Sequence, residues 1–240
     1  MGSFPHLKLP GSAGLPGSRS GQTEVCPTRH RKLQLTAGSV SLALALLCGA
    51  CSGSGGPTEE FAPVPNEKAP DQFKVRFDTT KGPVLIQVER DWAPIGADRF
   101  YTLVKTGYLN GDRFFRVVPN FIIQFGLNGD PKLTGRWRQA NLKDDPVKEN
   151  NMRGTLSFAT AGPGTRTTQL FMNTNDNVRL DGSGFAPFAR VIDGMGVVDR
   201  IFAGYGEQPD QPRIENEGNA YLLKEFPNLD YIKTASIIQE

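Results

Sequence analysis

The stretch that most constrains the fold is residues 113–126, RFFRVVPNFIIQFG, because it places one permanent cation, Arg116, in an otherwise apolar run. Pro119 and Asn120 divide the run, and both residue types favour turns. Successive side chains of a strand alternate between its faces, so Arg116 and Gln124 are predicted to meet on one surface across the turn. The segment therefore predicts a β-hairpin that carries a guanidinium group.

This guanidinium group has two interpretations. Arginine is usually exposed, so an Arg116 that faces solvent from an edge strand is the simpler one. A buried guanidinium must instead be paired or used, because desolvating a cation without a partner is costly. The same alternation predicts Phe114 on the face of Arg116, with Phe115 and Val117 on the opposite face. Segments further along the chain favour a functional role for Arg116.

Residues 71–240 are dominated by patterns typical of short strands. Thr80, Lys81 and Gly82 separate the first two strands as a hairpin turn would. Many short strands with few helices favour a sandwich or a closed barrel. The expected strands are 73–78, 84–88, 114–118, 121–125, 155–159, 169–173, 188–191 and 231–238, and the expected helices are 95–106, 196–202 and a short one at 221–226.

The amino-terminal residues 1–51 have the composition of an export leader. Basic residues at 29–32 precede the apolar run 40–47, VSLALALL, which is too short to span a bilayer comfortably. The run ends in Cys-Gly-Ala-Cys, which resembles the lipobox of bacterial lipoproteins with Cys51 as the lipidated residue. An ordinary signal peptide cleaved nearby is the alternative. Residues 52–70, rich in Gly, Ser and Pro, are expected to form a tether. We therefore expect an exported protein of the bacterial cell envelope, attached to a membrane by a lipid anchor at Cys51.

The expected globular part, residues 71–240, carries no net charge. The first 70 residues hold six Lys or Arg against four Asp or Glu, and the remaining residues hold 21 of each kind. The net charge of +2 therefore arises outside the globular part and does not indicate a nucleic-acid-binding surface. We expect no nucleic-acid partner.

The same residues lack the side chains that several common chemistries require. They contain no His and no Cys, which excludes catalysis by Ser-His or Cys-His pairs and the usual zinc ligand sets. Asp144, Asp145 and Glu149 suggest either a carboxylate or metal site or a solvated loop, and surface charge is the commoner outcome. No phosphate-binding glycine motif occurs between a strand and a helix. We expect no metal and no cofactor.

Four blocks of sequence follow one another at characteristic spacing. They are FFRVVPNFIIQFG at 114–126, GTLSFATAGPGTRTTQLFMN at 154–173, RLDG at 179–182 and GFAPFARVIDGMGVVDRI at 184–201. Together they resemble the cyclophilin family of peptidyl-prolyl isomerases, and the resemblance extends over residues 71–240. It implies a mainly β fold, a closed eight-stranded antiparallel barrel capped by two helices. We expect a monomeric enzyme whose partners are proline-containing polypeptides.

The resemblance also implies roles for individual residues. Arg116 corresponds to the catalytic arginine, and Gln124 corresponds to the amide that orients it. The residues that correspond to the peptide-binding surface and the proline pocket are Phe121, Ile122, Ala159, Thr160, Ala161, Gln169, Leu170, Phe171, Leu180 and Phe185. Among these, Thr160 replaces the usual Asn, Leu170 replaces a common Phe, and Phe185 replaces a frequent His.

Further departures from the family pattern alter the rim of the expected site. Phe115 replaces the His beside the arginine, and Arg179 stands in the place of a Trp that helps many eukaryotic members to hold cyclosporin. The sequence therefore predicts weak cyclosporin binding. Two functions remain open: an isomerase that assists the folding of exported proteins, and a cyclophilin-like module that binds peptides with little turnover. Arg116 with its pocket favours the first, and the altered rim of Phe115, Thr160 and Arg179 favours the second.

Overall fold

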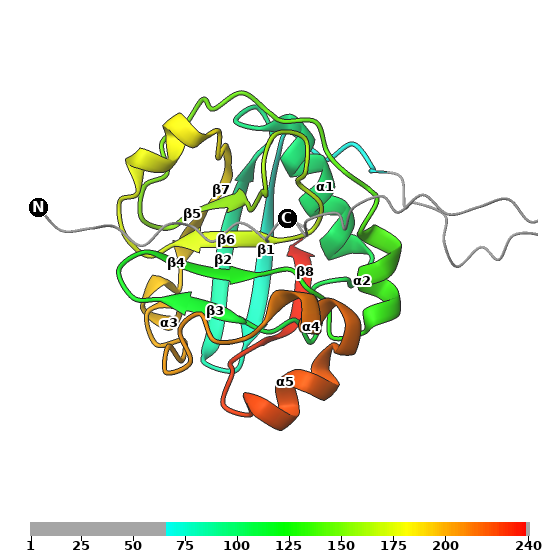
Figure 1. Cartoon of the computed structure of the whole chain (residues 1–240). Coiled ribbons are helices and arrows are strands. Elements are labelled where there is room, and N and C mark those ends of the chain that lie inside the picture. The colour runs from blue at the N-terminus through cyan, green and yellow to red at the C-terminus, as the bar shows by residue number, and fades with distance from the viewer. Residues whose placement is uncertain (1–65, 239–240) are drawn as a thin grey trace, which may run out of the picture. The chain divides into compact units, whose positions relative to one another are not determined.

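Residues 66–238 are the part of the chain that the computed structural model describes, and they form one antiparallel sheet with helices around it (Figure 1). The eight strands are β1 (Gln72–Thr79), β2 (Gly82–Glu89), β3 (Arg116–Val118), β4 (Ile122–Phe125), β5 (Thr155–Phe158), β6 (Leu170–Asn173), β7 (Pro187–Asp193) and β8 (Ile232–Ile238). The helices are α1 (Pro94–Lys105), α2 (Pro131–Trp137), α3 (Met195–Val198), α4 (Gln211–Glu217) and α5 (Asn219–Glu225), with a 3-10 helix, η2 (Val178–Ser183). The predicted mainly β fold is confirmed.

The helices agree with the sequence pattern less well than the strands do. The first expected helix corresponds to α1, but α3 is only four residues long and ends before the expected 202. The short helices α2 and α4 were not predicted. Both begin at a capping aspartate, Asp130 and Asp210, with Pro in the first turn, and this local signal could have identified them. Within residues 66–238, no helix combines the length and the apolar composition that crossing a bilayer requires.

The sheet curls into a half-barrel, and the closed barrel expected from the sequence is not formed. The strand order is β3-β4-β6-β5-β7-β2-β1-β8, so β3 and β8 are the edge strands. Between these edges the described residues make one isolated bridge, Arg113 to Tyr231, in place of a ladder. β3 is only three residues long, and the N–H of Val117 donates to the carbonyl oxygen of Gly206 at 3.1 Å. Another segment therefore already occupies the edge that closure would need.

Phenylalanine rings fill the interior of the half-barrel. Fully buried rings from the strands, from α1 and from the segment just before β3 pack with centroids 5.0–6.1 Å apart; they are Phe77, Phe100, Phe114, Phe125, Phe158 and Phe188. The prediction that Phe114 shares the face of Arg116 is therefore wrong. β3 begins only at Arg116, so strict alternation does not extend back to Phe114.

A second apolar cluster joins the hairpin to the carboxy-terminal helices. Phe115 is 1 % exposed and packs with residues of α4 and α5, including Ile214 and Leu222. Phe115 is therefore buried beneath these helices. The prediction that it forms part of the rim of the site is wrong. Figure 1 shows α4 and α5 beside the β3 and β8 edges.

Asp145 caps the amino-terminal end of α1. The prediction that Asp145 lies in a solvated loop is therefore wrong. Its two carboxylate oxygens accept hydrogen bonds from the N–H groups of Ile95 and Gly96, each at 2.9 Å. The side chain is 1 % exposed and pairs with the buried Arg166 at 3.2 Å. A capped helix end with a paired carboxylate explains why this acidic residue lies inside.

Residues 66–70, which the sequence assigns to the tether, contact α1. The side-chain oxygen of Asn66 accepts a hydrogen bond from Nε of Arg99 at 2.6 Å, and Arg99 is only 3 % exposed. Burial lowers the pKa of Arg99 to about 10. The ordered contacts thus begin before residue 71, whereas the leader with Cys51 lies outside the described residues.

Candidate active site

The β3–β4 hairpin brings Arg116 next to Gln124. The register of the two strands pairs Arg116 with Gln124 and Val118 with Ile122, across a turn in which Asn120 has φ of 57°. Nη1 of Arg116 donates a hydrogen bond to Oε1 of Gln124 at 3.0 Å. The predicted meeting of these two side chains is confirmed. The side chain of Arg116 is only 15 % exposed, so the interpretation as a solvent-facing surface cation does not hold.

Arg116 belongs to a chain of hydrogen bonds with a partner on either side. Nε2 of Gln124 donates onward to Oε1 of Gln169 at 2.8 Å. On the other side, Nε of Arg116 donates to Oε1 of Glu207 at 2.7 Å. Glu207 was not predicted, because it lies 91 residues from Arg116 and nothing in the local sequence connects the two. Two groups therefore hold the guanidinium from different sides.

An apolar cluster lies on the same face of the sheet as this chain. Phe171 is directly opposite Gln124 in the β4–β6 ladder, and opposite residues of a ladder share a face. Its ring meets the ring of Phe185 edge to face, with centroids 5.4 Å apart. The structure brings together six of the predicted pocket residues here: buried Ile122, Phe171, Leu180 and Phe185, with Phe121 and Ala159 packed against them. They form an apolar wall beside the guanidinium.

Leu170 is not part of this wall. Its side chain is fully buried in the interior cluster of the half-barrel, on the opposite face of β6 from Phe171. Gln169, Leu170 and Phe171 are consecutive in one strand, so they cannot all face the same surface. Strand alternation alone would have corrected this prediction.

Arg179 covers the outer part of the wall. Its guanidinium carbon lies 4.7 Å from the centroid of the Phe121 ring, a distance at which a cation is attracted to the ring face. The Nδ2 group of Asn177, two residues earlier, donates to the carbonyl oxygen of Phe121 at 2.8 Å. Both contacts hold Phe121 at the edge of the site.

The loop after β5 uses its own hydroxyl groups to keep its shape. The Thr160 hydroxyl accepts a hydrogen bond from the N–H of Gly162 at 3.0 Å, and the N–H of Ala161 donates to the Thr165 hydroxyl at 3.0 Å. Asp144 supports the loop from outside, because its Oδ2 accepts a bond from the N–H of Gly164 at 2.7 Å. The hydroxyl of Thr160 is therefore hydrogen-bonded within its own loop.

Buried asparagines that were not predicted support the wall from below. Asn151 donates to the carbonyl oxygen of Phe185 at 2.8 Å, and Asn177 donates to the side-chain oxygen of Asn173 at 2.8 Å. All three amides are at most 1 % exposed, and buried amides are retained where their hydrogen bonds are satisfied. They tie the chain before β5, β6 and the start of η2 together.

Comparison with known proteins identifies the family. A family model described as "Cyclophilin type peptidyl-prolyl cis-trans isomerase/CLD" matches residues 74–217. The chain belongs to the cyclophilin family. The predicted enzyme class, peptidylprolyl isomerase, is confirmed.

Named relatives of this cyclophilin occur in bacteria and fungi. A peptidyl-prolyl cis-trans isomerase of Acinetobacter baylyi is 40 % identical over 136 residues, which cover 53 % of this chain and 70 % of that protein. One of Schizosaccharomyces pombe is 35 % identical over 144 residues, covering 58 % of this chain and 90 % of that protein. A solved cyclophilin of Cryptosporidium parvum, determined in the presence of the dipeptide Ala-Pro, has a TM-score of 0.53 at 22 % identity and covers 70 % of this chain and 99 % of that chain. This structural likeness shows the fold.

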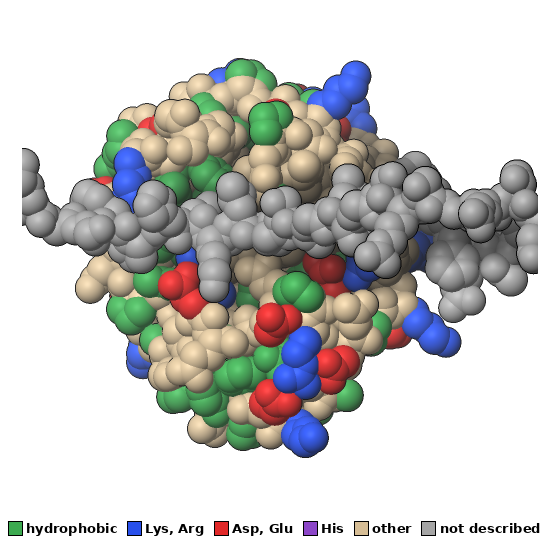
Figure 2. Space-filling view, in the orientation of Figure 1, with side chains coloured by type: hydrophobic (Ala, Val, Ile, Leu, Met, Phe, Trp, Pro, Cys, Tyr) green, Lys and Arg blue, Asp and Glu red, His purple; other side chains and the backbone are tan. Residues whose placement is uncertain are grey.

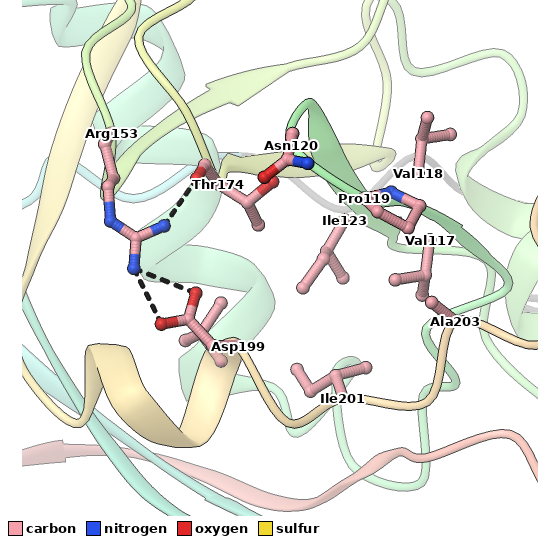
Figure 3. A pocket seen from close by; sticks show the side chains of 11 residues that line it. Val117, Val118, Pro119, Asn120, Ile123, Arg153, Thr174, Asp199, Ile201 and Ala203 are labelled. Atoms are coloured by element: carbon pink, nitrogen blue, oxygen red, sulfur yellow. Dashed lines mark hydrogen bonds and ion pairs between the residues drawn. The ribbon is translucent and has the colours of Figure 1, made fainter.

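A hollow of about 410 Å³ lies behind the hairpin of this cyclophilin and is distinct from the predicted site (Figure 3). Val117 and Ile123 line it from the faces of β3 and β4 opposite to Arg116, because they alternate with the site residues. Figure 3 shows the ion pair of Arg153 and Asp199, at 2.7 Å, on one side of it. None of the predicted site residues contributes to this hollow.

A buried carboxyl group supports the end of the hairpin. Oδ2 of Asp112 accepts a hydrogen bond from the N–H of Gly126 at 2.6 Å, and burial raises the pKa of Asp112 to about 8. Gly126 has φ of 102°, and a Cβ atom there would lie 2.2 Å from the carbonyl oxygen of Thr168. Only glycine therefore permits this close approach of β4 to the chain before β6.

Charged side chains of both signs lie intermixed on the face shown in Figure 2. On α4 and α5, for example, Arg213 pairs with Glu217 at 2.8 Å and with Glu225 at 2.9 Å. Across the part of the chain that the structure describes, no three His, Cys, Asp or Glu side chains are grouped as a metal site would require. The groups that the site presents are the Arg116 guanidinium, the amides of Gln124 and Gln169, and the apolar wall.

Proposed function

We propose that this cyclophilin accelerates rotation about X-Pro peptide bonds, with Arg116 as the hydrogen-bond donor to the prolyl nitrogen. The observation that carries the proposal is the position of Arg116, bound to Gln124 at 3.0 Å beside an apolar wall that includes Ile122 and Phe171. An apolar wall suits the prolyl ring, and a donor at its edge reaches the nitrogen of the same residue.

The reaction needs neither bond breaking nor a cofactor. Resonance gives the C–N bond partial double-bond character, and the barrier to rotation is about 18–20 kcal/mol. As the amide twists, the nitrogen lone pair leaves the resonance and becomes able to accept a hydrogen bond. A donor that meets the lone pair only in the twisted state lowers the barrier, whereas equal binding of both isomers would not. Arginine suits this role because it stays charged and its N–H groups form a rigid fork.

Proline-containing polypeptides are the proposed substrates. The Cryptosporidium parvum cyclophilin was determined in the presence of Ala-Pro, which supports this substrate class for a protein of the same fold. In this chain we place the peptide along Ala159, Thr160 and Ala161. Since the Thr160 hydroxyl is bound within its own loop, backbone groups of these residues are the expected peptide contacts.

An isomerase assay tests the role of Arg116. We expect the wild type to accelerate exchange of an X-Pro peptide, followed by NMR or by a coupled protease, and Arg116→Ala to lower kcat/KM by about 100-fold, as loss of a transition-state donor typically does. Arg200→Ala is the matched control, because Arg200 is an exposed arginine whose side chain donates to the carbonyl oxygen of Gly196. A folded Arg116→Ala protein with wild-type activity would refute the role of Arg116.

The competing candidate is a peptide-binding module with little turnover. Its support is the altered rim, in which Thr160 is committed to its loop and Arg179 covers Phe121. The same assay separates the two candidates when it is combined with a titration of the proline peptide. Binding without acceleration by the folded wild type would leave only the module.

We propose further that the enzyme acts outside the cytoplasm, tethered to a bacterial membrane through lipid on Cys51, where it assists the folding of exported proteins. The support is the sequence pattern of a basic flank, the apolar run 40–47 and small residues before a cysteine. Two-phase detergent partitioning of the wild type and Cys51→Ala tests the anchor. We expect only the wild type to enter the detergent phase, and equal aqueous partitioning would contradict the proposal.

A further inference from the structure

Residues 203–210 run along the free edge of β3 next to Arg116. The carbonyl oxygen of Gly206 accepts a hydrogen bond from the N–H of Val117 at 3.1 Å, one residue after Arg116 in the strand. Gly206 has φ of 55°, the left-handed conformation that glycine adopts readily. The segment therefore takes the place of a neighbouring strand at this edge, and its next residue is Glu207.

This segment is held by its own turns and by aromatic packing. Gly206 N–H donates to the Ala203 carbonyl oxygen at 3.0 Å, and Gln208 N–H donates to that of Tyr205 at 3.0 Å. The Tyr205 ring packs edge to face with Phe202 and with Phe226, each at 5.1 Å between centroids. The backbone at Glu207 is consequently fixed relative to β3.

The Glu207 carboxylate binds one side of the Arg116 guanidinium. Its Oε1 lies 2.7 Å from Nε and 2.5 Å from Nη2, while Gln124 binds Nη1 at 3.0 Å. A guanidinium has five N–H groups, and here Nε and Nη1 each donate one hydrogen bond, while Nη2 contacts Glu207 as an ion pair. Further N–H groups of Nη1 and Nη2 lie at the end of the side chain.

We propose that Glu207 is a positioning residue, which fixes the plane of the Arg116 guanidinium so that the N–H groups at its end are presented over the proline pocket. This inference rests on the proposed function, since it assigns the geometry of the donor. Gln124 alone holds the group through one nitrogen, which leaves it free to rotate about that contact. Glu207 supplies the second and third contacts that fix the plane.

A carboxylate has a second effect, which opposes the first. Its negative charge weakens the attraction between Arg116 and the lone pair of the prolyl nitrogen. The Glu207 side chain is 57 % exposed, and water screens charges at such positions strongly. Hydrogen-bond direction is not weakened in this way, so orientation outweighs neutralisation and removal of Glu207 lowers activity.

Three variants of the full chain test the inference by kinetics. We expect Glu207→Ala to lower kcat by about three- to fivefold with KM unchanged, the range of a partly exposed ion pair that acts in the transition state. Glu207→Gln keeps an acceptor oxygen and should retain most of the wild-type kcat. Glu217→Ala, which removes an exposed carboxylate from Arg213, is the matched control and should leave kcat unchanged. An unchanged or raised kcat in a folded Glu207→Ala protein would overturn the proposal.

An NMR measurement separates positioning from a general structural effect. The Nε–H signal of Arg116, assigned by its loss in Arg116→Ala, should shift and exchange faster with water in Glu207→Ala, but not in Glu217→Ala. A fall in kcat without any change in this signal would contradict positioning. If the folded wild type has no isomerase activity, the proposed function fails, and the Arg116 signal alone then decides whether Glu207 fixes the guanidinium.

Discussion

Asp112 lies shortly before the hairpin and Arg116 is its first strand residue, and the protein accommodates these two charged residue types in different ways. Glu207 and Gln124 bind the Arg116 guanidinium through oxygen atoms from two sides. The Asp112 side chain accepts a hydrogen bond from the N–H of Gly126 and has no cationic partner among its described contacts, so burial raises its pKa to about 8. The two residues therefore differ in whether an opposite charge lies beside them.

The raised pKa of Asp112 predicts that stability falls as pH rises. The folded protein binds this proton more tightly than the unfolded chain, in which the pKa is near its ordinary value of 3.8. The contribution is therefore complete below about pH 4 and is lost toward pH 8, with a slope of about 1.4 kcal/mol per pH unit from this group. Thermal unfolding of wild type and Asp112→Asn between pH 5 and 9 checks this.

We expect the wild-type melting temperature to fall more steeply with pH than that of Asp112→Asn. Asp91→Asn, a change at an exposed aspartate, is the control and should follow the wild type. Parallel curves for wild type and Asp112→Asn would contradict the assignment.

Arg179 predicts weak inhibition by cyclosporin. Its guanidinium lies over Phe121 at 4.7 Å, where many family members are expected to carry a tryptophan, so an apolar cyclic peptide meets a charge in place of an indole ring. Arg179→Trp should strengthen inhibition by about tenfold, because a buried aromatic contact contributes on the order of 1 kcal/mol or more. Inhibition of the isomerase assay measures this. Strong inhibition of the wild type, or none gained in Arg179→Trp, would refute the prediction.

At the scale of elements, the strands follow local sequence patterns, whereas the start of α1 depends on a distant partner. The first N–H groups of α1 have no side-chain cap of their own and are bound by Asp145 from the loop before β5. The same carboxylate pairs with Arg166, just before β6. One residue therefore joins α1 to the two segments that lead into β5 and β6.

Removing the Asp145 carboxylate should destabilise the fold strongly. Asp145→Ala leaves Arg166 buried without its inner partner and leaves the N–H groups of Ile95 and Gly96 without their acceptor, which should cost about 3–5 kcal/mol of unfolding free energy. Asp144→Ala is the control, because the Asp144 side chain is 40 % exposed and its pair with Arg166 should contribute about 1 kcal/mol or less. Urea denaturation measures both values. Equal losses in the two variants would contradict the assignment.

At the scale of the whole molecule, long-range contacts decide where the fold begins and how the sheet ends. Asn66 reaches Arg99, a buried cation whose other nitrogens donate to the carbonyl oxygens of Thr167 and Ala140 at 2.9 and 2.8 Å. The residues before β1 are therefore part of the packing around α1. At the β3 edge of the sheet, the segment that contains Gly206 occupies the position that a neighbouring strand would need to close the barrel.

The amino-terminal boundary can be tested with two shortened chains. A fragment that begins at Asn66 should unfold with the free energy of the complete chain. A fragment that begins at Asp71 leaves Arg99 one acceptor short and should lose about 1.5–3 kcal/mol, the contribution of a hydrogen bond to a charged group. Urea denaturation of both fragments provides the comparison. Equal stability would place the boundary at residue 71.

Patterns within a few residues were enough to predict the strands, α1 and the meeting of Arg116 with Gln124, because side-chain alternation and hairpin pairing depend on near neighbours in the chain. They did not predict the half-barrel, the capping role of Asp145 or the contact of Glu207 with Arg116. These features join segments far apart in the chain, 91 residues in the case of Glu207. Such contacts form only when the packed core brings these segments together, so no local pattern in the sequence specifies them.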